Sequence, residues 1–171
     1  MRSEKLRTEG DSPVQLLLIR HADAGDRDPL RWPDDTLRPL TGKGRKRQRR
    51  VAKRLRRREL VPTLLLASPW LRAWETAQLI TDIAGAPPPV ACPALAAPPA
   101  IRALAAAVGR PRGESILALV GHEPWLGELA SLLLTGEPNR LSIVFPKSGV
   151  LGLTAAGLTA GGATLAFFWN R

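Results

Sequence analysis

Three short apolar runs stand out along the chain, at residues 14–20, 63–67 and 115–121. Leucine, isoleucine, valine and alanine make up most of each run. Apolar runs of about five to seven residues are typical of strands that are buried on both faces of a parallel sheet. We therefore predict a strand at each of the three runs.

Patterns typical of helices lie between these runs. Thr41 is an expected N-cap for a helix to about residue 59, with a buried stripe that includes Val51, Ala52 and Leu55. Ser68 and Pro69 are expected to be the N-cap and first residue of another helix, which stops at Gly85. The residues expected on the buried side of that second helix are Leu71, Trp74, Gln78, Leu79 and Ile83.

The alternation continues to the end of the chain. The proline-rich residues 86–100 predict an irregular connection, with a short strand near Val90 and Ala91. The remaining predicted elements are helices over 101–108 and 124–134, ended by Gly109 and Gly136, and a terminal pair of strands at 148–154 and 163–169.

Alternating strands and helices predict an α/β fold, a three-layer α/β/α sandwich with a mostly parallel sheet. We expect a polar N-terminal tail at residues 1–12 and a single domain over residues 13–171. A chain of 171 residues can bury a core of its own. It leaves too little sequence for a large cap domain.

Composition narrows the class of protein. With 44% hydrophobic residues a disordered chain is not expected. The charged residues 1–10 do not form a signal peptide, and no apolar run reaches the roughly 18 residues of a membrane span. The lone Cys92 excludes an internal disulfide and is expected to be a passive small residue. We expect a cytoplasmic protein that does not contact a membrane.

The net charge of +10 is concentrated in one segment. Residues 45–58 contain ten basic side chains and no acidic one, and the rest of the chain is balanced at 15 basic and 15 acidic residues. The favoured interpretation is a solvated helix face. Docking of an acidic partner, or steering of anionic substrates, is the alternative. Nucleic-acid binding is disfavoured because no aromatic residue interrupts the segment.

Candidate chemistry lies at the strand ends. The chain has two histidines, and His21 and His122 each close an apolar run. Ligands of open α/β sheets bind outside the carboxyl ends of the strands, so these two imidazoles are expected to share one site. The alternatives are two structural histidines, or a metal pair completed by Asp23.

Arginines accompany the two histidines. Arg20 precedes His21, and Arg38 lies just before the expected helix start at Thr41. Arg72 falls in the first turn of a helix, where a cation is unfavourable unless an anion binds nearby. Guanidinium groups match phosphate oxygens, so the group predicts a phosphoryl site.

Four motifs in this order resemble the histidine phosphatase superfamily, with its phosphoglycerate-mutase-like fold, over roughly residues 14–155. The short chain, and Ala22 where many members carry glycine, point to the small phosphohistidine phosphatase branch. The motifs are Arg20-His21-Ala22-Asp23, Arg38-Pro39-Leu40-Thr41 followed by Gly44-Arg45, Ser68-Pro69 through Arg72-Ala73 and Thr76-Ala77, and Val120-Gly121-His122-Glu123-Pro124.

The resemblance implies a role for each residue. His21 would be the nucleophile that becomes phosphorylated and is then hydrolysed by water. Arg20, Arg38 and Arg72 would hold the phosphoryl oxygens, and His122 would donate a hydrogen bond to the same oxygens. No metal and no cofactor would be needed, since the arginines supply the positive charge.

The proton donor for an ester leaving group is left open. Glu123 resembles the acid that follows the second histidine in the acid-phosphatase branch, although the favoured interpretation of Glu123 is a simple acid at a helix N-terminus. Asp23 is the other candidate. Further rivals in the first loop are Asp26, Asp28, Asp34 and Asp35.

The favoured function is a protein phosphohistidine phosphatase acting through a phosphohistidine on His21. The alternative is a phosphomonoesterase for a small molecule or nucleotide, and a distant third is a non-catalytic phosphate- or RNA-binding module. The partner would then be a phosphorylated protein or a small phosphate. The five tryptophans are expected mostly in the core, although one or two of Trp32, Trp70 and Trp125 could line the mouth of the site.

Overall fold

A six-stranded sheet forms the centre of the computed structural model, which describes residues 13–109 and 115–169. The strand order is β3-β2-β4-β1-β5-β6; the first four strands are parallel, and β5 and β6 are antiparallel to their neighbours. This confirms the mostly parallel sheet. The strands are β1 (Val14–Arg20), β2 (Leu64–Ala67), β3 (Val90–Ala91), β4 (Ile116–Gly121), β5 (Val150–Ala155) and β6 (Ala163–Trp169).

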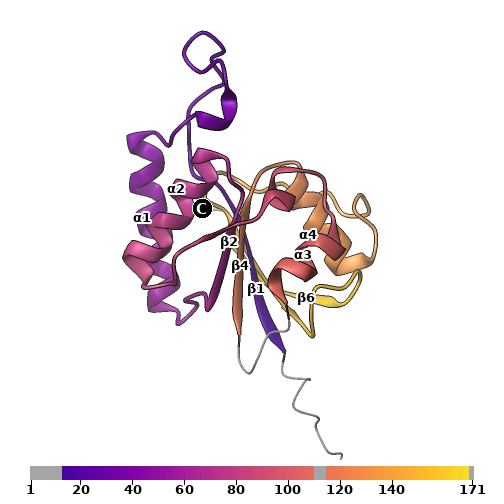
Figure 1. Cartoon of the computed structure of the whole chain (residues 1–171). Helices are drawn as coiled ribbons and strands as arrows, with labels where there is room; N and C mark the ends of the chain where they lie inside the picture. The colour runs from indigo at the N-terminus through magenta and orange to yellow at the C-terminus, as the bar shows by residue number, and fades with distance from the viewer. Residues whose placement is uncertain (1–12, 110–114, 170–171) are drawn as a thin grey trace, which may run out of the picture.

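Helices cover both faces of the sheet (Figure 1). Helices α1 and α2 pack on one face, and α3 and α4 pack on the other. The three-layer α/β/α architecture is therefore confirmed. The helices are α1 (Gly42–Arg57), α2 (Leu71–Ala84), α3 (Ile101–Val108) and α4 (Trp125–Thr135), with short 3-10 turns η1 (Asp35–Leu37) and η2 (Pro93–Ala96).

Strand β1 shows why the apolar runs predict the strands well. Successive side chains of a strand point to opposite faces of the sheet. Leu16 and Leu18 accordingly join the core under α3 and α4, while Leu17 and Ile19 join the core under α1 and α2. A strand covered on both sides needs apolar residues at every position, and this is the pattern in the sequence.

The predicted caps of α1 and of the later helices are confirmed. Thr41 is the N-cap of α1, and its hydroxyl oxygen accepts a hydrogen bond from the Gly44 N–H at 2.9 Å. Gly85 and Gly136 end α2 and α4 in the left-handed conformation, and Gly109 follows α3 with a positive φ as well. Each element therefore begins and ends close to its predicted bounds.

Three predictions about α2 are wrong. Its N-cap is Trp70 and its first residue is Leu71, not Ser68 and Pro69, and the Ser68 hydroxyl is engaged with His122. Gln78 is exposed, and the buried side instead carries small and polar residues. Small side chains let α2 lie close to the sheet, and two polar side chains on that side serve the strand ends. The buried residues are Arg72, Ala73, Thr76, Ala77, Leu79, Ile80 and Ala84.

The tryptophans are not core residues, contrary to expectation. All five lie among the described residues and each is only partly buried. Leucine and alanine fill the two core layers, and Phe145 is the largest fully buried side chain of the described residues. Trp74 and Trp169 pack against the edge of the core beside α1 and α2. The remaining tryptophans are thus free to serve the surface or the site.

The long connection over residues 22–40 projects beyond the ends of β1 and α1 (Figure 1). It holds the turn η1, and it lies at the carboxyl ends of the parallel strands. No helix in the described part of the chain has both the length and the apolar run required to cross a membrane. The predicted polar tail, residues 1–12, lies outside the described residues.

Candidate active site

The parallel pairing of β1 with β4 brings the two histidines together. Arg20 pairs with Gly121, so that the next residue of each strand is a histidine at the same edge of the sheet. The ring centroids of His21 and His122 are 5.1 Å apart, and the two residues are 7% and 3% exposed. His21 and His122 therefore lie side by side, as expected from the sequence.

His21 is held in one neutral form. Its Nδ1 lies 2.7 Å from the carbonyl oxygen of Ala22, and a carbonyl can only accept a hydrogen bond, so Nδ1 carries the hydrogen. The lone pair is then on Nε2. Burial, together with the positive charges of Arg72, Arg20 and Arg38, lowers the pKa of His21 to about 3. The imidazole is therefore neutral and nucleophilic over the whole physiological pH range.

His122 is held by Ser68. Its Nε2 lies 2.8 Å from the Ser68 hydroxyl oxygen, which also accepts from the Trp70 N–H at 3.2 Å. The Ser68 hydroxyl hydrogen has no other acceptor among the described residues, so we infer that it is donated to Nε2 and that Nδ1 carries the ring hydrogen. Nδ1 is buried and without a hydrogen-bond partner in the described part of the chain. Burial and the neighbouring positive charges lower the pKa of His122 to about 2.

Arg20 and Arg72 bring positive charge to the histidines. One terminal nitrogen of Arg20 donates to the Phe145 carbonyl at 2.5 Å, and one of Arg72 donates to the Asp35 carbonyl at 2.8 Å. The Nε of each arginine is buried and has no hydrogen-bond partner within the described residues. Burial lowers the pKa of both groups. Buried hydrogen-bond donors that carry a positive charge and lack an acceptor are suited to bind an anion.

Asp35, at the start of η1, bridges two of the arginines. Its carboxylate accepts from Arg38 Nε at 2.8 Å and from a terminal nitrogen of Arg72 at 3.3 Å. Arg38 also donates to the carbonyls of Ala24 and Gly25, at 3.2 and 2.6 Å. These contacts fix both guanidinium groups at the site. From the sequence, Asp35 is predicted only as a rival proton donor, and its position three residues before Arg38 is the signal that indicates the ion pair.

An open hollow of about 400 Å³ lies at the strand ends, and it is lined by His21, His122, Arg20, Arg38 and Arg72. Trp70 and Trp125 line it as well, which confirms that tryptophans near the motifs border the site. The Trp70 ring lies 4.5 Å from the His122 ring and 4.6 Å from the Arg72 guanidinium carbon, so it packs against both. Lys147 also lines the hollow and was not predicted from the sequence, where it lies far from every motif.

The two candidate proton donors differ in environment. Glu123 lines the hollow, its carboxylate accepts from the Phe145 N–H at 2.9 Å, and burial raises its pKa. Asp23 instead pairs with Lys147 and accepts from the Thr41 hydroxyl at 3.0 Å, and the hydrogen bond from Lys147 is the main cause that lowers its pKa. Glu123 is thus the carboxyl group that holds a proton more readily.

The backbone that follows His21 is fixed by α1 and α2. The Thr76 hydroxyl accepts from the Ala22 N–H at 3.0 Å and donates to the Arg72 carbonyl at 2.6 Å. On the other side, Gly44 lies so close to Asp23 that a β-carbon there would overlap the Asp23 carbonyl oxygen. Threonine and glycine at these two positions of the motifs therefore position the segment that carries His21.

No cluster of three or more histidine, cysteine or carboxylate side chains suited to a metal ion is found among the described residues. Asp23, the third ligand of the alternative metal site, is held by Lys147 and Thr41. His21 and His122 instead lie beside the guanidinium groups of Arg20, Arg38 and Arg72.

A comparison with protein families gives this site its context. A model of the histidine phosphatase superfamily (branch 1) matches residues 16–96, which include Arg20, His21, Arg38 and Arg72. The chain belongs to this superfamily. His122 lies beyond the matched residues, and the β1–β4 pairing places it beside the others. An uncharacterized protein of Picosynechococcus sp. is 34% identical over 142 residues, which are 82% of this chain and 84% of that protein.

Solved structures show the same fold. The protein histidine phosphatase SixA, complexed with tungstate, matches with a TM-score of 0.75 at 23% identity, over 91% of this chain and 96% of that one. A putative phosphohistidine phosphatase SixA from Agrobacterium tumefaciens matches with a TM-score of 0.73 at 22% identity, over 94% and 99% of the two chains. The predicted phosphoglycerate-mutase-like fold of the histidine phosphatase superfamily, without a large cap domain, is therefore confirmed.

Proposed function

We propose that this member of the histidine phosphatase superfamily hydrolyses phosphohistidine on proteins, through a covalent phosphohistidine on its own His21. One observation carries the proposal: the neutral His21 has its Nε2 lone pair available within a group of buried cationic donors. The likeness in fold to phosphohistidine phosphatases supports the substrate class.

In the first step, His21 Nε2 attacks phosphorus and the bond from phosphorus to the leaving nitrogen breaks. The phosphoryl oxygens carry the charge of the transition state. Arg20, Arg72 and the Nδ1–H of His122 are the groups that would hold these oxygens, since each has a buried donor available. Arg38, fixed by Asp35, adds positive charge on the side of the 22–40 connection.

In the second step, water attacks the phosphorus and the bond to His21 Nε2 breaks, which releases inorganic phosphate and regenerates the imidazole. Glu123 would supply a proton to the leaving group in the first step and take one from water in the second. Its raised pKa suits it to this exchange. A leaving imidazole that already carries a proton needs little help, so Glu123 matters most for esters.

The experiment that tests this function is the capture of the intermediate. Brief incubation with a 32P-labelled phosphohistidine peptide, followed by quenching in alkali, is expected to leave label on the protein. The label should be acid-labile, and it should be absent from His21→Ala. Label of equal amount in His21→Ala, or no hydrolysis of any phosphorylated compound, would contradict the proposal.

We further propose that the reaction needs no metal ion, because the arginines provide the positive charge. Turnover is then expected to be unchanged by EDTA. Loss of turnover in EDTA, with recovery on addition of Mg²⁺, would contradict this part of the proposal.

A second candidate, a phosphomonoesterase for small molecules or nucleotides, is favoured by one observation. Glu123 is a carboxyl group with a raised pKa in the hollow, and ester leaving groups require such a donor. Comparison of kcat/KM for a phosphohistidine peptide, a nucleoside monophosphate and an aryl phosphate ranks the two candidates. A higher value for the nucleotide than for the peptide would favour the second.

A further inference from the structure

A basic groove runs along one side of α1. It has a volume of about 750 Å³ and is lined by six basic side chains of α1 and by four other residues, Val51, Pro146, Ser148 and Trp169. The groove contains no acidic side chain. Apart from the adjacent Lys46 and Arg47, the basic side chains lie three or four residues apart, as expected for one side of a helix, and they span about 21 Å. They are Lys43, Lys46, Arg47, Arg50, Arg54 and Arg57.

These cations are not neutralised within the described part of the chain. None of its ion pairs includes a side chain of the basic groove. Arg45, on the same helix but outside the groove, is paired with Glu75 of α2. The positive charge of the groove is therefore available to a partner, in contrast to that of Arg45.

One wall of the basic groove is aromatic, which the sequence of the basic segment did not indicate. Trp169, at the end of β6, lies under the guanidinium of Arg54, with 4.0 Å between the guanidinium carbon and the ring centroid. Its ring also stacks on Phe167, with centroids 4.8 Å apart. The groove thus combines cations with an apolar surface. Because Arg54 and Phe167 already pack on the indole, Trp169 is poorly suited to stack with a nucleic-acid base.

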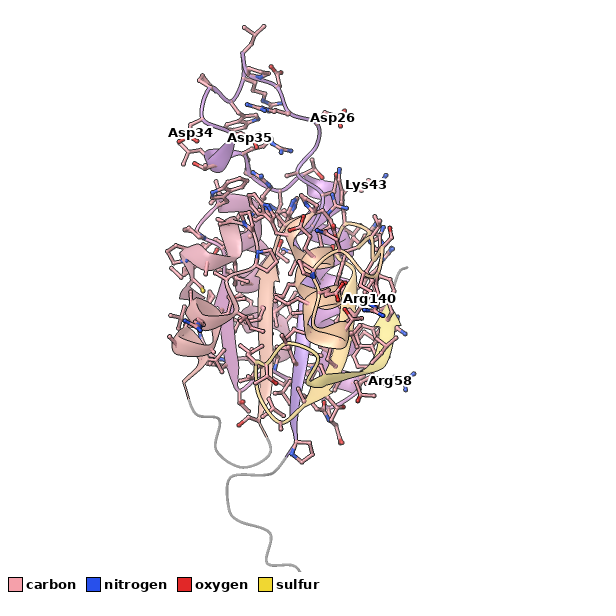
Figure 2. All side chains as sticks on the ribbon, turned by 90° about the vertical axis from the view of Figure 1, so that its right-hand side faces the viewer. Asp26, Asp34, Asp35, Lys43, Arg58 and Arg140 are labelled. Atoms are coloured by element: carbon pink, nitrogen blue, oxygen red, sulfur yellow. The ribbon has the colours of Figure 1, made fainter. Side chains whose placement is uncertain are left out.

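The basic groove adjoins the catalytic hollow. Pro146 and Ser148 line the groove, while Lys147 between them lines the hollow and pairs with Asp23. The Ser148 N–H also donates to the carbonyl of His21 at 3.2 Å. Figure 2 shows Lys43 near the end of the molecule that carries Asp26 and Asp35, and Arg58 toward the opposite end. A bound chain could therefore run from His21 along α1.

We propose that the basic groove binds an acidic segment of the phosphohistidine-bearing substrate protein while the phosphoryl group lies at His21. This inference rests on the proposed function and adds a recognition element outside the catalytic hollow. Six cations in a groove that is lined by no acidic side chain select for carboxylates. The shared segment 146–148 gives a continuous path between the two sites.

Two synthetic phosphohistidine peptides test the proposal. They share the residues around the phosphohistidine; one has aspartate and glutamate on both flanks, and the other has asparagine and glutamine at the same positions. In about 0.15 M salt we expect kcat/KM to be roughly tenfold higher for the acidic peptide. In the double variant Arg47→Gln/Arg50→Gln this preference should fall to about twofold or less.

The matched control is Arg49→Gln/Lys53→Gln. It removes the same charge from exposed positions of the same helix that do not line the basic groove, and it is expected to keep the preference. Thermal unfolding checks that both double variants are folded. Equal turnover of the two peptides by the native protein, or equal loss of preference in both double variants, overturns the docking role.

The two proposals fail in different ways. Hydrolysis of neither peptide overturns the proposed function and the docking role with it, whereas hydrolysis of both at one rate overturns docking alone. A short single-stranded RNA serves as a competing probe in fluorescence anisotropy. RNA binding that is lost in Arg47→Gln/Arg50→Gln and kept in the control, without a preference for the acidic peptide, would assign the groove to nucleic acid and overturn the proposal.

Discussion

At the scale of single residues, the site depends on which nitrogen of each histidine carries the hydrogen. The Ala22 carbonyl leaves the His21 Nε2 lone pair available, and the Ser68 hydroxyl leaves the His122 Nδ1–H available. Under the proposed function, one imidazole would act as an acceptor toward phosphorus and the other as a donor toward its oxygens. The two identical side chains would perform opposite tasks because their hydrogen-bond partners differ.

Ser68 is a positioning residue, and its removal tests this division. In Ser68→Ala the Nε2 of His122 loses its hydrogen-bond partner, so the ring is free to change its tautomer. We expect kcat/KM to fall about tenfold. The 15N chemical shifts of the His122 ring should move from a fixed tautomer toward a mixture. Ser68→Thr keeps a hydroxyl and should restore both values; unchanged ring shifts in Ser68→Ala would contradict the assignment.

Glu123→Gln tests the proton donor. With Gln, turnover of an ester with a poor leaving group, such as phenyl phosphate, is expected to fall by about 10²-fold, and phosphohistidine turnover by much less. The protonated carboxyl is the donor, so ester turnover by the native protein should fall as pH rises through the raised pKa of Glu123. A pH series with both proteins measures this. The same alkaline decline in Glu123→Gln would assign the proton to another group.

At the scale of elements, the sequence predicts most of the fold and only part of the site. The strands are predictable because burial on both faces demands continuous apolar residues, as in β1. The buried side of α2 was mispredicted because Arg72 and Thr76 face inward, toward the strand ends, where hydropathy alone expects apolar residues. The pairing of Asp35 with Arg72 and the position of Lys147 in the hollow depend on tertiary contacts that no local pattern encodes.

The start of α1 provides a test at this scale. Gly44→Ala places a β-carbon on the Asp23 carbonyl oxygen, so either α1 or the backbone after His21 must move. We expect a loss of about 1–3 kcal/mol in the free energy of unfolding, and lower kcat/KM. Gly42→Ala, in the same turn, meets no atom within 4 Å and should leave both quantities nearly unchanged. Urea unfolding of the two variants makes the comparison; equal stability would show that the contact is unimportant.

At the scale of the whole molecule, the site makes stability depend on pH. The pKa values of His21 and His122 are lowered to about 3 and about 2, whereas an unfolded histidine titrates near ~6.5. Below that value the unfolded chain binds protons that the folded chain excludes, so the free energy of unfolding falls as pH falls. Above pH ~6.5 both histidines are neutral in the folded and in the unfolded chain, so they do not make the free energy of unfolding depend on pH. The two buried imidazoles are thus kept neutral, and this lowers the stability of the folded protein in acid.

Urea unfolding at a series of pH values between 7 and 4 checks this dependence. We expect the free energy of unfolding to decline below pH ~6.5, by up to about 1.4 kcal/mol per pH unit for each histidine. His122→Gln should reduce the slope because one of the two groups is removed. A constant free energy of unfolding over this range in the native protein would contradict the buried, neutral state of the pair.

The pairing of β1 with β4 has one more consequence. Arg20 and Gly121 pair at the carboxyl ends of the central strands β1 and β4, although about a hundred positions separate them in the chain, and a histidine follows each of them. A partly folded molecule that lacks this ladder has no second imidazole beside the first. Under the proposed function, phosphoryl transfer would therefore require the complete topology, and incomplete or misassembled molecules would be inactive rather than unselective phosphatases.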